Sequence, residues 1–196
     1  MRQIMLAILL LTGSTTLAAQ WRVAVLSGSA TSHGDARDDS DPAHPEFHAE
    51  RPATLAVTLA RDAGRWRVSV EGRHSTADLS EVSHSVAVTT FGAFKAWGAG
   101  VELGVRIAGR PLAPELRAGL GVGGDRWSLA GAGARWRATA RGSLEADFPV
   151  ARAWSAVVRG EATIGPSVFT AEELPEGFVQ RKMWRIGIAL GAARRL

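Results

Sequence analysis

Residues 97–109 read WGAGVELGVRIAG, and this stretch decides which kind of fold the chain adopts. Every second residue from Trp97 to Ile107 is apolar, and the residues between them are glycines, one glutamate (Glu102) and one arginine (Arg106). Successive side chains of a β-strand point to opposite faces, so the stretch predicts a strand with one apolar face and one face of glycine and charge. The nature of the fold depends on which face points into the protein.

The same alternation recurs eight times along the chain. The predicted strands cover residues 20–28, 53–61, 65–74, 95–107, 112–123, 132–148, 153–164 and 181–193. Tight Gly- or Pro-containing turns alternate with longer connections, which are residues 29–52, 75–94, 124–131 and 165–180. Eight antiparallel strands with turns at one end and loops at the other predict an all-β, up-and-down barrel.

The first residues have the organisation of an export signal. Arg2 precedes an apolar run at residues 4–11, and small residues follow it. The apolar run is shorter than the roughly 20 residues that a spanning helix needs. The sequence therefore predicts a secretory signal peptide over residues 1–19 and one barrel domain over residues 20–196.

The composition limits the function classes. The chain has no cysteine, so an exported form must be stabilised by burial, sheet closure or lipid contact rather than disulfides. Its net charge is +4. A basic excess of this kind could indicate a nucleic-acid-binding protein. The export signal and the distribution of the arginines along the strands favour structural ion pairs instead, and we expect no nucleic-acid partner.

Two kinds of barrel fit the alternation. A soluble periplasmic, lipocalin-like calyx would point its apolar face inward around an apolar ligand, whereas a membrane barrel would point that face toward lipid. The eleven residues 97–107 match the 9–11 residues of a tilted membrane strand. Glycines on the polar face would make room for arginines inside an eight-stranded barrel, where space is limited. These features favour a transmembrane β-barrel.

Aromatic residues of the apolar face lie near the strand ends. Such a distribution predicts two belts at the lipid–water boundaries, because amphipathic rings prefer that environment. The predicted aromatic girdles consist of Trp21, Trp66, Trp97, Trp136, Phe148, Trp154 and Trp184.

The polar face carries arginine and glutamate but no lysine. We count ten arginines, including Arg22 and Arg135, against five glutamates, an excess of five positive charges. Guanidinium groups bind carboxylates bidentately in enclosed environments. We expect Glu102 and Arg106 to pair with opposite charges on neighbouring strands, and water, anions or an inward-folding acidic loop to offset the excess. The predicted lumen ion pairs involve Arg67, Glu71, Arg73, Glu102, Arg106, Glu115, Arg117, Arg137, Arg141, Glu145, Arg159, Glu161 and Arg185.

The chain has two lysines, and both occur in the same local pattern. Lys95 and Lys182 each stand two residues before a tryptophan of the predicted belts, on the loop side. A lysine in that position either extends toward lipid phosphates, including those of lipopolysaccharide, or is an ordinary solvated residue of the rim.

These features resemble those of the small bacterial outer-membrane barrels, such as the OmpA membrane domain and OmpX. The resemblance covers the export signal, the eight strands, the alternating connections and the last strand, KMWRIGIALGAARRL at residues 182–196. It implies an outer-membrane location, and we expect a monomer. The chain departs from that family at Leu196, where an aromatic residue is usual, and in having no tyrosine.

The first long loop is acidic. Residues 27–53 carry six acidic residues and two arginines. The candidate cation ligands in it are His33, Asp35, Asp38, Asp39, Asp41, His44, Glu46 and His48. Their spacing matches neither an EF-hand nor a zinc signature, so we predict no metal and no cofactor.

Serine and histidine lie together near the second long loop, in the pairs His74-Ser75 and Ser83-His84-Ser85. A lipid A-modifying enzyme needs a base within reach of its serine and a third group that orients the base. The sequence does not fix such a geometry, so we predict a protein that is not an enzyme, with a lipid A-modifying activity as an alternative. A narrow anion-permeable pore is a further alternative. The favoured function is structural or interactive, with the acidic loops contacting an extracellular partner.

Overall fold

The computed structural model describes residues 20–41, 45–83, 86–109, 114–129 and 133–196. The predicted signal peptide lies outside the described residues. The elements are β1 (Gln20–His33), β2 (Ala36–Asp38), β3 (Glu46–Ala63), β4 (Trp66–Ser83), β5 (Val86–Ala108), β6 (Glu115–Leu129), β7 (Arg135–Ala151), β8 (Trp154–Gly165), the 3-10 helix η1 (Ala171–Glu173), β9 (Phe178–Gln180) and β10 (Met183–Arg195).

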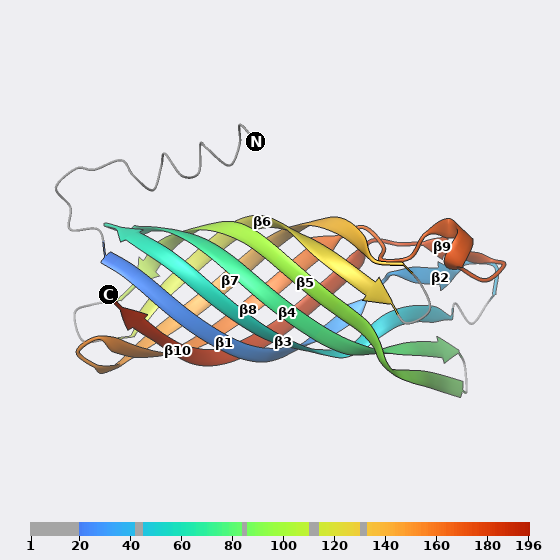
Figure 1. Cartoon of the computed structure of the whole chain (residues 1–196), viewed down its shortest axis with the longest axis horizontal. Coiled ribbons are helices and arrows are strands. Elements are labelled where there is room, and N and C mark those ends of the chain that lie inside the picture. Colours follow the sequence, from blue (N-terminus) through green and yellow to red (C-terminus); the bar gives the residue numbers. More distant parts are fainter. Residues whose placement is uncertain (1–19, 42–44, 84–85, 110–113, 130–132) are drawn as a thin grey trace.

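Eight long strands form a closed ring. Each is antiparallel to its neighbours in the order β1, β10, β8, β7, β6, β5, β4, β3, and β1 closes the ring by pairing with β3. The short strands β2 and β9 pair with each other, and β2 also joins the end of β3. Figure 1 shows the barrel lying horizontally, with β2 and β9 at the right-hand end. The predicted all-β, eight-stranded barrel is confirmed.

The strands extend further at the loop end than the sequence predicts. The residues assigned to the first two long loops are largely paired strand, and the β4–β5 hairpin projects beyond the ring (Figure 1). Two register shifts, between Glu50 and Ala53 and between Ala77 and Leu79, interrupt the alternation there. A bulge moves the side chains that follow it to the other face of the sheet. The apolar/polar alternation of the sequence therefore ends at the bulge, although the strands stay paired beyond it.

The apolar face points outward. In β5, Trp97, Leu103 and Ile107 are 62%, 51% and 55% exposed, whereas Glu102 is half-buried. The other outward apolar residues of the strands include Val25, Leu55, Val57, Leu59, Val70, Val101, Leu120, Val122, Leu144, Ile186, Ile188 and Leu190. A calyx needs the opposite arrangement, with apolar side chains around its ligand. The exterior is therefore suited to lipid.

Glycines of the inner face make room for charged side chains. A Cβ at Gly98 would lie 2.0 Å from Oδ1 of Asp125, and a Cβ at Gly119 would lie 2.6 Å from Oε1 of Glu102. Arginines also occupy this space, as the sequence predicts: a Cβ at Gly98 would lie 3.1 Å from Nε of Arg73, and a Cβ at Gly100 would lie 3.2 Å from Nη2 of Arg141. The described residues include no helix that is long and apolar enough to cross a bilayer.

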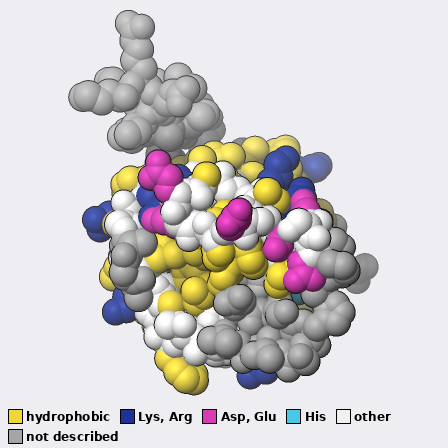
Figure 2. All heavy atoms as spheres, turned by 90° about the vertical axis from the view of Figure 1, so that its right-hand side faces the viewer, with side chains coloured by type: hydrophobic (Ala, Val, Ile, Leu, Met, Phe, Trp, Pro, Cys, Tyr) yellow, Lys and Arg dark blue, Asp and Glu magenta, His cyan; other side chains and the backbone are white. Residues whose placement is uncertain are grey.

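The interior has an apolar layer at the loop end. Figure 2 shows hydrophobic atoms at the centre of this end, with acidic side chains above and to the right of them. Trp127, which is only 1% exposed, points inward rather than joining the aromatic belts, and the guanidinium carbon of Arg185 lies 5.1 Å from the centre of its ring. The buried members of this apolar cap are Ala36, Ala49, Ala77, Phe94, Ala96, Trp127, Leu129, Val168, Phe169 and Met183.

Candidate functional site: the ion-paired interior and the loop-end rim

Glu71 holds the centre of the charged interior. This carboxylate on β4 pairs with Arg141 on β7, and its Oε2 lies 3.1 Å from Nη1 of Arg159 on β8. Nη2 of Arg159 donates to Glu102 on β5 at 2.5 Å. The prediction that Glu102 pairs with a neighbouring strand is wrong for this residue, because its partner comes from across the lumen. The pairs therefore connect opposite walls of the barrel.

A second cluster lies beneath the apolar cap. Asp125 accepts hydrogen bonds from Nε and Nη2 of Arg73 at 3.0 and 2.7 Å, and from Nη2 of Arg185 at 3.0 Å. Nη1 of Arg73 also donates to Glu161 at 3.1 Å. Sequence reasoning missed Asp125 because it ended the strand at residue 123. The signal was present, since Asp125 continues the inward parity of Gly121 and Gly123.

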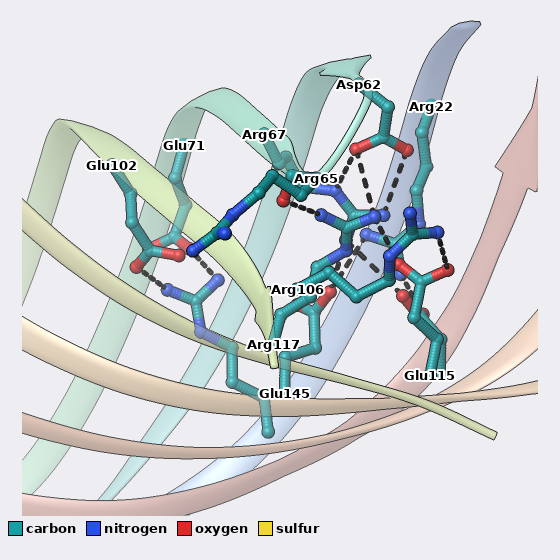
Figure 3. Close-up of polar contacts among 12 residues, drawn as sticks. Arg22, Asp62, Arg65, Arg67, Glu71, Glu102, Arg106, Glu115, Arg117 and Glu145 are labelled. Carbon is teal, nitrogen blue, oxygen red and sulfur yellow. Dashed lines mark hydrogen bonds and ion pairs between the residues drawn. The ribbon is translucent and has the colours of Figure 1, made fainter. Parts of the chain in front are cut away.

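A third cluster lies toward the tight turns, and Figure 3 shows how its side chains converge. Arg67 donates to Asp62 at 2.7 Å and to Glu145 at 2.6 Å. Arg22 pairs with Asp147 and lies 3.2 Å from Glu145.

Arg117 completes this third cluster by pairing with Glu115. Asp62 and Asp147 are lumen partners beyond those predicted from the sequence. Asp62 belongs to the end of β3 rather than to a turn, and Asp147 shares the parity of Glu145.

Two predicted lumen arginines lie at the barrel ends. The Arg106 side chain is 43% exposed and 3.8 Å from Glu115 on the neighbouring strand. Arg137 donates to the carbonyl oxygens of Ser167 and Phe169 in the connection after β8, at 2.7 and 3.4 Å, so the described contacts place it against backbone rather than a carboxylate.

The predicted charge excess is smaller than five in the structure. Asp62, Asp125 and Asp147 add three negative charges to the inner face. Arg135 pairs with Glu173, which comes from the connection between β8 and β10. This contact lies at the exposed rim rather than inside the lumen, and the Arg135 guanidinium lowers the pKa of Glu173 to about 2.

Small cavities remain between the ion pairs. One of about 60 Å³ is lined by Arg73, Arg159 and Arg185 among others, and one of about 10 Å³ lies beside Arg67 and Glu145. The Nε atoms of Arg159 and Arg185 are buried and have no hydrogen-bond partner within the described part of the chain. These volumes accommodate a few water molecules, which would satisfy such groups.

The predicted girdle residues are all exposed on the outer surface. Trp21, Trp66, Phe148 and Trp154 lie near the turn end of their strands, and Trp136 and Trp184 lie near the loop end. Trp97 lies in the middle of β5, because that strand continues past the expected rim. Arginines not foreseen in the sequence accompany the turn-end belt: the guanidinium carbons of Arg61, Arg65 and Arg194 lie 5.4–5.7 Å from the centres of tryptophan rings.

The candidate catalytic pair is separated. His74 points outward, with its ring 4.2 Å from that of Trp97, whereas Ser75 is buried on the inner face and its Oγ lies 3.0 Å from Oγ1 of Thr54. Adjacent strand residues face opposite sides, so His74 is not positioned to activate Ser75. His84 and Ser85 lie outside the described residues.

The candidate cation ligands of the first loop do not converge in the described part of the chain. Within it, no group of three or more His, Cys, Asp or Glu side chains is close enough to hold a metal ion. His44 lies outside the described residues. Asp39 instead contacts Arg37 and Arg181, and Glu46 accepts a hydrogen bond from the Gly34 amide at 2.5 Å.

Asp35 is a buried carboxyl group at the loop end, between β1 and β2 and outside the membrane-spanning part. Its backbone is left-handed (φ 73°), and its Oδ1 accepts a hydrogen bond from the Val168 amide at 3.3 Å. Oδ2 is buried and has no hydrogen-bond partner among the described residues. Burial raises the pKa of Asp35 from 3.8 to about 7, with Arg185 opposing the rise and Glu46 adding to it.

We expect the segment that holds Asp35 against Val168 to open more readily as the pH rises from about 4 to about 7. The folded state keeps the proton over this range and the opened segment releases it, so the free energy of opening falls with rising pH. Amide hydrogen exchange at Val168, corrected for the intrinsic exchange rate, measures this free energy of opening at each pH. Asp35→Asn keeps an acceptor without the charge, so its corrected protection should not change over this range. An equal pH dependence in both proteins would contradict the assignment.

The fold is a closed eight-stranded antiparallel β-barrel with an ion-paired interior and an apolar exterior. No protein-family model matches the chain, and no curated protein matches it by sequence. Solved structures do match. Neisserial surface protein A aligns with a TM-score of 0.61 and 9% identity, covering 91% of this chain and 99% of that protein. The outer membrane protein OprG from Pseudomonas aeruginosa aligns with a TM-score of 0.58 and 13% identity, covering 91% and 96%. The similarity is one of fold.

Proposed function

We propose that the protein is an integral barrel of the bacterial outer membrane, that its interior is closed by ion pairs, and that its loop end contacts a partner outside the cell. The supporting observation is the distribution of polarity. Arginine and carboxylate side chains are paired and buried in the lumen, while the outer surface consists of exposed valine, leucine, isoleucine and tryptophan. Buried ions need partners, and an exposed apolar surface of this kind needs lipid.

Membrane location is tested by fractionation of a bacterial host that expresses the protein with its leader. We expect the protein in the outer-membrane fraction, with detergent required for its extraction. Recovery of a folded protein from the soluble periplasmic fraction would contradict the proposal.

The structure supports a contact role for the loop end. The β4–β5 hairpin projects beyond the ring and carries Phe91, which is 83% exposed. The connection between β8 and β10 presents the exposed acidic residues Glu172 and Glu176. An exposed aromatic side chain on a projecting hairpin and exposed acidic residues at the same end of the barrel are suited to an interaction with another macromolecule.

We expect the reconstituted protein not to conduct ions. The described interior contains ion pairs that cross the lumen and cavities that hold only a few waters, so a hydrated ion has no continuous path through it. Single-channel recording in planar bilayers measures this, with a general porin as the positive control. Reproducible conductance steps that depend on the protein would contradict a closed barrel and favour the pore.

A further inference from the structure

A cleft of about 640 Å³ opens on the outer rim of the loop end, where β10 begins. Trp184 and His33 form one side of it, and they are directly opposite each other in the β1–β10 pairing. The other lining residues that matter here are three cations, Arg37, Arg181 and Lys182. Arg181 precedes Lys182 in the chain, whereas Arg37 is distant in sequence and is brought beside them by the pairing of β2 with β9.

One carboxylate orients the two guanidinium groups. Nε of Arg37 donates to Oδ1 of Asp39 at 2.8 Å, and Arg181 pairs with Oδ2 of the same residue. Both arginine side chains remain more than 40% exposed. A guanidinium group has five N–H donors, so this contact leaves donors for a ligand. Counting Glu46 and Asp39 against the three cations, the cleft carries a net charge of +1.

The backbone beneath the cleft is tightly packed. Gly34 has a φ of 87°, and a Cβ on it would lie 2.1 Å from the carbonyl oxygen of Lys182. The amide of Arg181 donates to the carbonyl oxygen of Asp35 at 2.9 Å. These contacts fix the backbone that carries Arg181 and Lys182, so the cations lie on a defined surface.

The cleft lies at the end of an apolar column. Below Trp184, the outward residues of β10 are Ile186, Ile188 and Leu190, which are 61%, 62% and 58% exposed. A hydrocarbon chain in contact with this column would bring its headgroup to the level of Trp184 and the cleft.

The neighbouring strand presents hydroxyl groups along the same column. Ser27, Ser29 and Thr31 are exposed on the outer face of β1, where other strands carry valine, leucine or isoleucine. They are opposite Leu190, Ile188 and Ile186 in turn, and His33 then leads into the cleft. Thr31, the nearest of them to the cleft, donates its hydroxyl to the carbonyl oxygen of Ile186 at 3.3 Å, so its polar group is satisfied within the barrel.

We propose that this cleft binds the phosphate of a phosphorylated glycolipid of the outer leaflet, with an acyl chain along the apolar column of β10. The inference rests on the proposed outer-membrane location. Arginine forks and a lysine ammonium group are the usual phosphate ligands in proteins. The position of the cleft directly above an apolar column favours a lipid over a free anion.

The chain supplies a matched control. Lys95 on β5 also precedes a tryptophan by two residues, and it is exposed. Its cross-strand neighbours are Thr76 and Ser128, and it does not line the cleft. Lys95→Gln therefore removes one rim cation without altering the cleft.

The test uses native mass spectrometry of the detergent-solubilised full barrel, with bisphosphorylated lipid A as the probe. We expect one bound lipid A, and an affinity about tenfold lower in the Arg181→Gln/Lys182→Gln double variant, because two cations near an anionic headgroup are lost. Lys95→Gln should bind as the wild type does. Dephosphorylated lipid A should bind as weakly to the wild type as lipid A does to the double variant.

Three results would overturn the proposal: an unchanged affinity in the double variant, an equal loss in Lys95→Gln, or complete displacement of lipid A by inorganic phosphate, which would make this a free-anion site. Heat-modifiable electrophoretic mobility shows that each variant has folded. A variant that inserts into the membrane and binds lipid A as the wild type does contradicts only the cleft. A wild-type protein recovered folded without detergent contradicts the outer-membrane proposal itself.

Discussion

Replacement of Glu71 by leucine is expected to destabilise the folded barrel by about 3–5 kcal/mol, because a buried ion pair is broken and its partners remain charged. Glu71 has a 7% exposed side chain and contacts both Arg141 and Arg159, whose side chains are each 4% exposed. Arg141 would retain only the more distant Glu161, at 3.6 Å. Urea unfolding in lipid vesicles, or the temperature at which the folded electrophoretic band disappears, measures the loss.

Two variants serve as controls for Glu71→Leu. Glu102→Leu should cost less, since Arg159 keeps Glu71 and Glu161 as partners. Glu176→Leu, on an exposed loop, should change the free energy of unfolding by no more than about 0.5 kcal/mol. If all three variants unfold at the wild-type midpoint, the interior charges do not stabilise this barrel as described.

Gly191→Val is expected to prevent closure of the barrel. Gly191 faces inward on β10 at the pairing with β1, and a Cβ there would lie 1.9 Å from the carbonyl oxygen of Val25 and 2.9 Å from the Cα of Leu26. Because both atoms belong to the backbone, the two strands must separate to admit a side chain. We expect loss of the folded electrophoretic form after refolding into detergent or vesicles.

Gly72→Val is the matched control for that substitution. Gly72 lies on the outer face of β4, and a Cβ there meets no described atom within 4 Å. The same valine should therefore fold normally and add to the apolar exterior. Equal folding yields of the two variants would contradict close approach at the β1–β10 pairing.

The sequence predicts the membrane part of the fold well for a physical reason. Lipid requires an apolar side chain at every second position, and the enclosed lumen requires small or charged ones between them, so both constraints are local. Beyond the membrane neither constraint applies. The bulges at Glu50 and Ala77 shift the parity there. The loop-end parts of β3, β4 and β5 were therefore predicted as loops, although they are paired strand.

For the interior, the sequence predicts which residues face the lumen but not which of them pair. The identity of the inward arginines follows from parity, but the partner of each depends on which strands face one another across the lumen. That is a property of the closed ring, so neither the contact of Glu102 with Arg159 nor the arginine partners of Asp125 can be predicted from neighbouring residues. The buried position of Asp35 was missed for a related reason, since it depends on a connection more than 100 residues later.

The lumen pairs also have a consequence for the order of assembly. Arg22 on β1 finds its carboxylates on β7, and Glu71 on β4 finds its arginines on β7 and β8. A half-built sheet would expose these charges singly, and a lone ion in hydrocarbon is costly. Insertion and charge neutralisation must therefore occur together, so that the chain enters the bilayer in one concerted step rather than hairpin by hairpin.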